Sequence, residues 1–263
     1  MDPSAIRHAA RLLAAARLSG ERLLRLPPAC RPRDGDEAYA IQLALVDELG
    51  DSIAGWKVAL SPEHGTLIGV IVGSRLHASG ATIDASRYAM RGAEAEIAFR
   101  FDRALPPRQR EYARDEVVDA VTALVGLEIV DTRFVSYEWT PLIERVAEFM
   151  SNGALVVGEP RSDWRRFDLS QLEASVAIDG QDVVRRRGGH PTRDPLIPAV
   201  ALVNKLRLGA GAPAGSIVTT GSYVGMPLAP PRCGVEAGFT QFGSARCRLS
   251  GDPGEPGSPP PAE

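Results

Sequence analysis

The chain of 263 residues has almost no lysine. Only two of its 30 basic residues are lysines, Lys57 and Lys205, and the others are arginines. The formal net charge is −3, so there is no basic excess and no electrostatic case for a nucleic-acid or anionic-membrane partner. Because arginine keeps its proton, each lysine marks a position where a titratable amine could be needed.

Cysteines and long apolar runs are scarce as well. The three cysteines, Cys30, Cys233 and Cys247, are odd in number and form no CxxC motif. This pattern argues against a disulfide framework and a structural zinc site, and it indicates half-buried thiols in a reducing cytoplasm. No apolar run approaches the ~20 residues that a membrane-spanning helix needs.

The two ends of the chain differ in composition. Arginines interrupt every apolar stretch of residues 1–26, which argues against a signal peptide and leaves an arginine-rich transit peptide as an alternative. Apolar residues from Ile6 to Ala16 recur at helical spacing and predict an amphipathic helix that starts near Pro3. The last segment, 251–263, is rich in proline and glycine and predicts a disordered tail.

Between the ends, the sequence predicts few helices and many short strands. Helices are expected over 36–49, 114–124 and 195–208. The apolar, strand-like segments are 55–60, 67–72, 95–101, 126–134, 154–158, 174–180, 216–221 and 244–249. Strands with so few helices between them argue against a βαβ doubly wound sheet and favour an α+β fold with a mainly antiparallel core.

Two glutamates stand out in the strand that follows Gly92. Side chains alternate along a strand, so Glu94 and Glu96 share one face while Ile97 and Phe99 occupy the other. Like carboxylates at such neighbouring positions repel each other unless a cation lies between them or water screens them. Both interpretations are open, a solvated strand face and a cation site.

A third glutamate, Glu128, lies in the middle of the strongly apolar segment 126–131. A carboxylate there is costly unless it is paired or bound to a metal, and a salt bridge to one of the arginines is an alternative. Three carboxylates from two strands, with no histidine or cysteine nearby, would form a hard oxygen site. Such a site prefers Mg²⁺ or Mn²⁺.

Lys57 also lies inside an apolar segment, 55–60. A buried lysine has a depressed pKa and can act as a general acid, a base or a Schiff-base former, which arginine cannot do. A lysine at a sheet edge with its amine in water is the alternative. Lys205 falls on a predicted helix, where a solvated residue is expected. The loop 219–225 has backbone N–H groups and hydroxyls that could hold a carboxylate, although many turns look the same.

Taken in order, eight segments carry a family resemblance. They are AYAIQ (38–42), GWKVAL (55–60), EAEIAF (94–99), LEIVDTR (127–133), GGHP (188–191), AVALVNKL (199–206), TTGS (219–222) and FTQFGSARCRL (239–249). Over residues 5–250 the chain resembles the 2-keto-4-pentenoate hydratase family of the fumarylacetoacetate hydrolase superfamily. This family includes 2-oxohepta-3-ene-1,7-dioate hydratases and 4-oxalocrotonate decarboxylases.

The resemblance implies a fold, a division of the chain and a set of site residues. The fold is a mixed β-roll or sandwich core of the fumarylacetoacetate hydrolase C-terminal-domain type. An N-terminal helical portion (1–52) precedes the catalytic β-roll domain (53–250), and the tail (251–263) follows it. The implied Mg²⁺ or Mn²⁺ ligands are Glu94, Glu96 and Glu128, the catalytic residue is Lys57, and the substrate-binding residues are Leu60, Thr220, Gly221 and Ser222.

The resemblance also implies an activity. It is the addition of water to a 2-hydroxy-2,4-dienoate, or 2-keto-4-enoate, through a metal-bound enolate to give a 4-hydroxy-2-keto acid. Alternatives are a 4-oxalocrotonate-type decarboxylase, an acylpyruvate-type C–C hydrolase and a catalytically silent keto-acid-binding subunit. A homo-oligomer is expected, with a decarboxylase or hydratase as a further partner. A carboxylate-pair glycosidase is disfavoured, because neighbours on one strand face do not flank a sugar bond.

The chain departs from the family pattern at two places. Ser74 stands where an acidic residue near the lysine is usual, and Glu148-Phe149 stands where an Asp-Asn pair is frequent. Loss of an acidic partner predicts an altered pKa for Lys57. His64, next to Glu63, invites comparison with the His–Glu pair of hydrolases in the wider superfamily, but its setting predicts a loop.

Overall fold

The structure is a computed structural model and describes residues 1–251. Within them, five α-helices contribute a smaller part of the fold than the strands do. The helices are α1 (Pro3–Ser19), α2 (Gly35–Leu49), α3 (Arg114–Val118), α4 (Leu142–Ala147) and α5 (Leu196–Leu206). Short 3₁₀ turns lie at Pro28–Cys30, Gly73–Arg75, Trp164–Arg166 and Leu169–Gln171.

The first helix begins and ends where its sequence dictates. The carboxylate of Asp2 accepts a hydrogen bond from the backbone N–H of Ser4 at 2.8 Å, and Pro3 occupies the first turn, where no backbone donor is needed. Gly20 ends the helix in the left-handed conformation, with φ of 83°. Ala9 and Leu13 on one face are fully buried, so α1 is held by packing of its apolar stripe.

In the part of the chain that the structure describes, twelve strands form two sheets. The strands are β1 (Ile53–Ser61), β2 (Gly65–Val72), β3 (Leu76–Ala78), β4 (Thr82–Asp84), β5 (Gly92–Phe101), β6 (Val121–Val130), β7 (Asn152–Val157), β8 (Glu173–Ile178), β9 (Gln181–Arg187), β10 (Ile217–Ser222), β11 (Gly234–Phe239) and β12 (Gly243–Ser250). The larger sheet has the order β2-β1-β10-β5-β6-β7-β3, and the smaller has the order β4-β12-β11-β8-β9. Most neighbours are antiparallel, and β1–β10, β3–β7 and β4–β12 are parallel.

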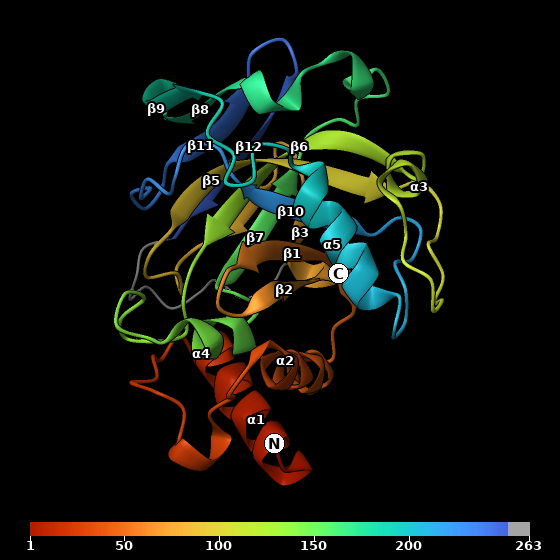
Figure 1. The fold of residues 1–263 in the computed structure, drawn as a ribbon. Coiled ribbons are helices and arrows are strands. Elements are labelled where there is room, and N and C mark those ends of the chain that lie inside the picture. Colours follow the sequence, from red (N-terminus) through yellow and green to blue (C-terminus); the bar gives the residue numbers. More distant parts are fainter. Residues whose placement is uncertain (252–263) are drawn as a thin grey trace, which may run out of the picture.

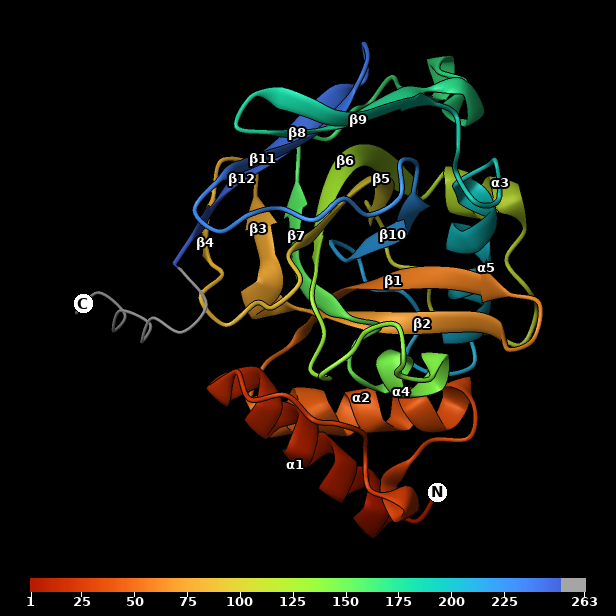
Figure 2. The same cartoon turned by 90° about the vertical axis from the view of Figure 1, so that its left-hand side faces the viewer.

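The two sheets and the helices form layers. Strands β11 and β12 of the smaller sheet contact β5 and β6 of the larger one. Helices α1 and α2 lie together at the opposite end of the molecule from β8 and β9 (Figure 1), and α2 packs on α4 and β2 (Figure 2). Helix α5 covers β1, β2 and β10. The middle of β5 and β6 therefore lies deep in the molecule.

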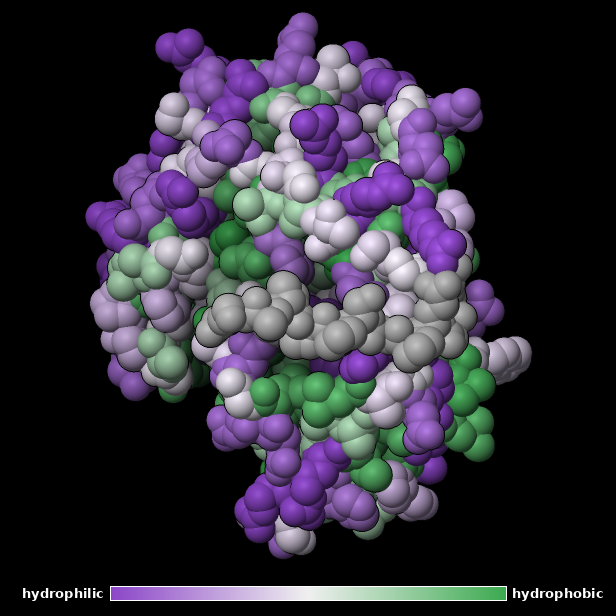
Figure 3. Space-filling model, turned by 180° about the vertical axis from the view of Figure 1, so that it is seen from behind, coloured by the Kyte–Doolittle hydropathy of each residue, from purple (hydrophilic) through white to green (hydrophobic). Residues whose placement is uncertain are grey.

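The core is aliphatic and aromatic, and its burial is the main favourable term in folding. Phe99 and Phe101 of β5 are fully buried, as are Leu13 of α1 and Ile41 of α2. Seen from behind, most of the surface is polar, with scattered apolar patches between polar groups (Figure 3). One contiguous core thus joins the helical portion to the sheets.

The predicted α+β class is confirmed, and one predicted helix is wrong. The helix expected over 114–124 ends at Val118, because strand β6 begins at Val121 and pairs along its whole length with β5. The apolar pattern of segment 121–124 predicts a helix wrongly, because over so few residues it does not distinguish a helix from a strand. Strand β9 was not predicted, since its residues are mostly charged and exposed at a sheet edge.

Three other expectations have different outcomes. The three cysteines are free, but they are buried rather than half-buried. The division at residues 52 and 250 stays a prediction, and the predicted tail beyond residue 251 lies outside the described residues. Within residues 1–251, no helix is long and apolar enough to cross a membrane.

The parallel pairing of β1 with β10 gives a test of the fold at Gly55. A Cβ atom at Gly55 would lie 2.2 Å from the carbonyl oxygen of Ile217, so Gly55→Ala must separate the two strands. We expect a loss of about 3 kcal/mol in the free energy of unfolding, measured by urea denaturation. The control is Gly234→Ala on β11, where the new methyl group has 3.6 Å to its nearest neighbour; equal losses in both variants would contradict the assigned close approach.

Candidate metal centre

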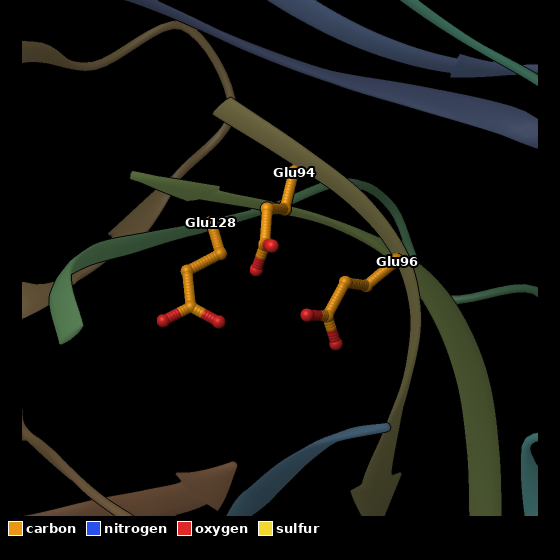
Figure 4. A group of neighbouring side chains, drawn as sticks. All are labelled: Glu94, Glu96 and Glu128. Atoms are coloured by element: carbon orange, nitrogen blue, oxygen red, sulfur yellow. The ribbon is translucent and has the colours of Figure 1, made fainter. Parts of the chain in front are cut away.

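Three glutamates meet on one face of the larger sheet. Glu94 and Glu96 project from β5 on the same face, and Glu128 of β6 lies directly across from Glu94. One carboxylate oxygen from each lies within 4.8 Å of the others. Figure 4 shows the three carboxylates pointing into a common space from two adjacent strands. The predicted shared face of Glu94 and Glu96 is therefore present, and it includes Glu128.

The last residues of β10 fix the carboxylate of Glu96; residues 219–222, expected in a loop, belong to this strand, whose register shifts between Thr219 and Ser222. The backbone N–H groups of Thr220 and Gly221 both donate to Glu96 Oε2 at 2.8 Å. Gly221 has a φ of 121°, a conformation that glycine adopts without steric cost and that lets this end of the strand approach the carboxylate. Two backbone donors and the burial of Glu96 hold one oxygen in place.

Glu128 is fully buried and has two partners on one oxygen. Lys57 Nζ donates to Glu128 Oε1 at 2.6 Å, and Asn152 Nδ2 donates to the same oxygen at 2.9 Å. The second oxygen, Oε2, is buried and has no hydrogen-bond partner. A buried carboxylate oxygen without a donor is costly, so the site is incomplete as a protein-only arrangement.

Lys57 reaches the carboxylates through a narrow space. It lies in β1 opposite Gly69 of β2, and a Cβ at Gly69 would be 2.9 Å from Lys57 Cγ and 2.6 Å from Met150 Cβ. The side chain is 8% exposed. The absence of a side chain at Gly69 thus makes room for the stem of Lys57.

The turn that precedes β7 has an uncommon backbone. Phe149, Met150 and Ser151 all lie in the left-handed region, with φ of 65°, 52° and 60°, and non-glycine residues adopt this region at a cost. The turn places Met150 beside Lys57 and Asn152 on Glu128. Because tertiary contacts must hold such a turn, its position is defined by its surroundings.

The three carboxylates and the lysine shift one another's protonation. Burial, reinforced by the neighbouring carboxylates, raises the pKa of Glu94 to about 8 and that of Glu96 to about 7, against the opposing effect of Lys57. Burial lowers the pKa of Lys57, but the charges of Glu128, Glu94 and Glu96 outweigh it and raise this pKa above its ordinary value. The amine is therefore protonated at neutral pH, which differs from the depressed pKa expected from burial alone.

The donor set fits a divalent cation. When a bound cation keeps all three carboxylates ionised, they and the one ammonium group carry two negative charges in a buried space, and the free oxygen of Glu128 is a ligand without a partner. Thr219 Oγ1, across β1–β10 from Lys57, is also buried without a partner. Oxygen donors alone suit Mg²⁺ or Mn²⁺. The geometry can thus hold such an ion.

The remaining predicted site residues lie around this cluster at different distances. Ser222 is opposite Glu96, and its hydroxyl donates to the carbonyl of Gly225 at 2.7 Å. Leu60 lies at the exposed end of β1, where strand alternation turns it to the opposite face from Lys57. The substrate-binding roles of Leu60, Thr220, Gly221 and Ser222 stay predictions.

The two departures from the family pattern, Ser74 and Glu148, have their own partners in the structure. Ser74 lies at the surface, where its hydroxyl donates to Asp51 at 2.5 Å, so Ser74 removes no partner from Lys57, whose acid partner is Glu128. Glu148 is buried and forms an ion pair with Arg133 at 3.1 Å.

His64 and Lys205, which also stand out in the sequence, lie away from the carboxylate cluster. His64 lies in the turn between β1 and β2, as predicted for a loop, 3.7 Å from Glu63. Lys205 is partly exposed on α5 and pairs with Asp36 at 2.7 Å. Lys57 is therefore the lysine of the site.

Sequence reasoning missed Asn152, Gly69 and Thr219. Asn152 begins a strand that is otherwise apolar, and this isolated amide was the only local signal that it has a partner. Gly69 lies inside a strand-like apolar run, where an internal glycine indicates close approach of another group. Their roles depend on the pairing of strands that are distant in the sequence.

Comparisons with known proteins agree with this geometry. No family model matches the chain. A 2-keto-4-pentenoate hydratase of Burkholderia vietnamiensis is 28% identical over 233 residues, which cover 84% of this chain and 88% of that protein. A 2-keto-4-pentenoate hydratase of Paraburkholderia phymatum is 27% identical over 261 residues, which cover 95% and 99%. The chain is a relative of the 2-keto-4-pentenoate hydratases. The family resemblance predicted from the sequence is thereby confirmed.

A solved structure shares its fold with nearly the whole of this chain. It is a 4-oxalocrotonate decarboxylase from Pseudomonas putida G7, complexed with magnesium and adipate, with a TM-score of 0.82 and 20% identity. The match covers 95% of this chain and 98% of that one. A fumarylacetoacetate hydrolase family protein from Yersinia pestis aligns less closely, with a TM-score of 0.56. The predicted fold is thereby confirmed.

The raised pKa values predict how stability depends on pH without metal. The folded state holds protons on Glu94 and Glu96 more tightly than the unfolded state, so their stabilising contribution is lost as pH rises toward 7–8. Lys57 is charged in both states below pH 9 and adds no slope. We expect the melting temperature of chelator-treated protein to fall by roughly 5 °C or more between pH 6 and 8.5, by calorimetry.

Added Mg²⁺ should oppose this fall, because ions bind the deprotonated carboxylates of the folded state. The control is the double variant Glu94→Gln with Glu96→Gln, whose melting temperature should depend much less on pH. A fall of the same size in the double variant would contradict the assignment of the protons to these two residues.

Proposed function

We propose that the chain is a metal-dependent hydro-lyase that adds water to a 2-hydroxy-2,4-dienoate, or 2-keto-4-enoate, and forms a 4-hydroxy-2-keto acid. The observation that carries this proposal is the buried set of Glu94, Glu96 and Glu128 around Lys57, with the unpartnered oxygen of Glu128. The two hydratases that the chain resembles over most of its length support it. The substrate class is a small 2-keto acid.

In this proposal Glu94, Glu96 and Glu128 hold Mg²⁺ or Mn²⁺. The bound cation supplies positive charge that polarises a substrate carbonyl group. Thr220 and Gly221 orient Glu96 through their backbone N–H groups, and Asn152 and Lys57 orient Glu128. These four contacts fix two of the three carboxylates before substrate arrives, which is the preorganisation that catalysis requires.

Lys57 is the proposed proton donor. Its amine is protonated at neutral pH, lies within the carboxylate cluster and is largely shielded from water. Conversion of a dienol to its keto form requires a proton at a substrate carbon, and Lys57 Nζ can deliver and recover it. Glu128, hydrogen-bonded to the same amine, holds it in position. The hydroxyl of Ser222, opposite Glu96 across the β5–β10 pair, is assigned to substrate binding, whereas Leu60 faces away from Lys57 and keeps no role in this proposal.

A decarboxylase of the 4-oxalocrotonate type is the second candidate. The observation that favours it is the fold match at a TM-score of 0.82 to such an enzyme complexed with magnesium and adipate. Incubation with 2-hydroxypenta-2,4-dienoate and with 4-oxalocrotonate in the presence of Mg²⁺ separates the two. Loss of ultraviolet absorbance without CO₂ release supports the hydratase, and CO₂ release from 4-oxalocrotonate supports the decarboxylase.

The setting of the enzyme is also part of the proposal. We assign it to the cytoplasm, because three free cysteines suit a reducing compartment, and to the catabolism of aromatic compounds, which yields dienoates of this kind. A homo-oligomer is proposed, with a decarboxylase or hydratase as a further partner.

The metal assignment is tested by Glu96→Gln. The amide keeps an oxygen for the N–H groups of Thr220 and Gly221, so the fold should be retained, but it removes the negative charge. We expect Mg²⁺-dependent turnover of 2-hydroxypenta-2,4-dienoate to fall by about 10²-fold or more. Glu63→Gln at the surface is the control. Full activity in Glu96→Gln would contradict the assignment of Glu96 as a metal ligand.

The proton-transfer assignment is tested by Lys57→Arg. The guanidinium keeps the positive charge but does not release a proton, so we expect turnover to fall by about 10²-fold or more. Lys205→Arg makes the same chemical change at a partly exposed ion pair and should leave turnover unchanged. A Lys57→Arg enzyme with the full rate would restrict Lys57 to an electrostatic role.

A further inference from the structure

A second polar hollow lies at the junction of the helical portion and the larger sheet. Its volume is about 210 Å³. Five of the eight residues that line it are arginines: Arg17, Arg22, Arg75, Arg87 and Arg133. Arg17 lies near the end of α1 and Arg22 in the loop after it, Arg75 ends the 3₁₀ turn after β2, Arg87 lies before β5, and Arg133 follows β6. We call this the arginine hollow. Because the five come from separate segments, the fold creates the charge cluster.

Only two of the five arginines have carboxylate partners. Arg22 and Arg133 both contact Asp131, at 3.2 and 3.5 Å, and Arg133 also pairs with Glu148. Asp84 is the one acidic residue in the lining. Five guanidinium groups thus face three carboxylates, which leaves two positive charges.

The other three arginines donate to neutral oxygens. Arg17 donates to the backbone carbonyl of Asn152 at 3.0 Å, Arg75 donates to the hydroxyl of Tyr88 at 3.1 Å, and Arg87 donates to the carbonyl of Leu18. Among the described residues, none of these three arginines has a carboxylate within salt-bridge distance. Their charge is therefore balanced by no protein group in direct contact.

Arg17 is the buried arginine of the hollow that has no carboxylate partner within residues 1–251. It is 5% exposed, and its Nε is buried with no hydrogen-bond partner. Burial, together with the nearby charge of Arg133, lowers its pKa to about 9. A buried cation with an unused donor destabilises the fold unless a counter-charge reaches it.

We propose that the arginine hollow binds a small doubly charged oxyanion of the inorganic phosphate class. The two surplus positive charges match a dianion. Guanidinium groups donate in a planar fork that fits the oxygens of a phosphate, or of a short dicarboxylate, in pairs. The volume of about 210 Å³ admits a molecule of this size, not a nucleotide or a polymer.

The arginine hollow is separate from the carboxylate cluster but lies behind the same turn. Arg17 donates to the carbonyl oxygens of Glu148 and Asn152, on both sides of the left-handed residues 149–151. Tyr88, also in the lining, donates to the carbonyl of Gly153 at 2.8 Å. The bound anion would therefore hold the groups that fix this turn, without touching Glu94, Glu96, Glu128 or Lys57.

The test is binding of inorganic phosphate to the full chain without divalent metal. We expect saturable binding by isothermal titration calorimetry and a rise in melting temperature. The double variant Arg75→Gln with Arg87→Gln should bind at least tenfold more weakly, while its hydratase activity without phosphate stays unchanged. These two residues are more exposed than Arg17, so the variant should fold. Arg185→Gln on exposed β9 is the control and should bind as the parent does.

A parallel titration with succinate separates the two sources of a dianion. Binding of either ion that is lost in the Arg75/Arg87 variant and retained in Arg185→Gln supports the proposal. The ion that binds with the lower dissociation constant shows whether the ligand is a phosphate or a dicarboxylate. The proposal is overturned if chloride at equal ionic strength gives the same rise in melting temperature. It is overturned equally if the Arg75/Arg87 variant binds both dianions as tightly as the parent.

Discussion

Three carboxylates share a space from which most water is excluded, and a single ammonium group lies among them. Burial, reinforced by mutual repulsion that is strong in such surroundings, raises the pKa of Glu94 and Glu96. The rest of the site is built to tolerate this charge. Lys57 and Asn152 share one oxygen of Glu128, two backbone N–H groups hold Glu96, and the remaining charge suits a divalent cation.

This constraint explains features of the fold that look unrelated in the sequence. Gly69 has no side chain because the stem of Lys57 passes it, and Gly55 has none because β10 must lie close to β1. The left-handed turn before β7 carries a backbone cost. This turn places the side-chain amide of Asn152 on Glu128, and Arg17 holds the turn by donating to the backbone carbonyl of Asn152.

The sequence reveals a site residue when the residue conflicts with its neighbours along the chain. It does not reveal a residue whose role depends on strands that pair from distant parts of the chain. Glu128 and Lys57 are charges in apolar strands, and Glu94 and Glu96 alternate with large apolar residues, so each is visible within a few positions. Asn152 and Thr219 carry no such conflict, since only the assembled sheet gives them their neighbours. In the same way, β6 begins at Val121 because β5 pairs with it, which no short window reveals.

The parallel pairing of β1 with β10 has a consequence for the order of folding. The hairpin of β5 and β6, which carries all three glutamates, can form early from adjacent segments. Positions 57 and 219 are brought together only when β10 is inserted between β1 and β5, and such distant pairing is slow. The donors that hold Glu96 come from the same distant segment, at Thr220 and Gly221. The carboxylate site is therefore complete only when β10 has joined the larger sheet.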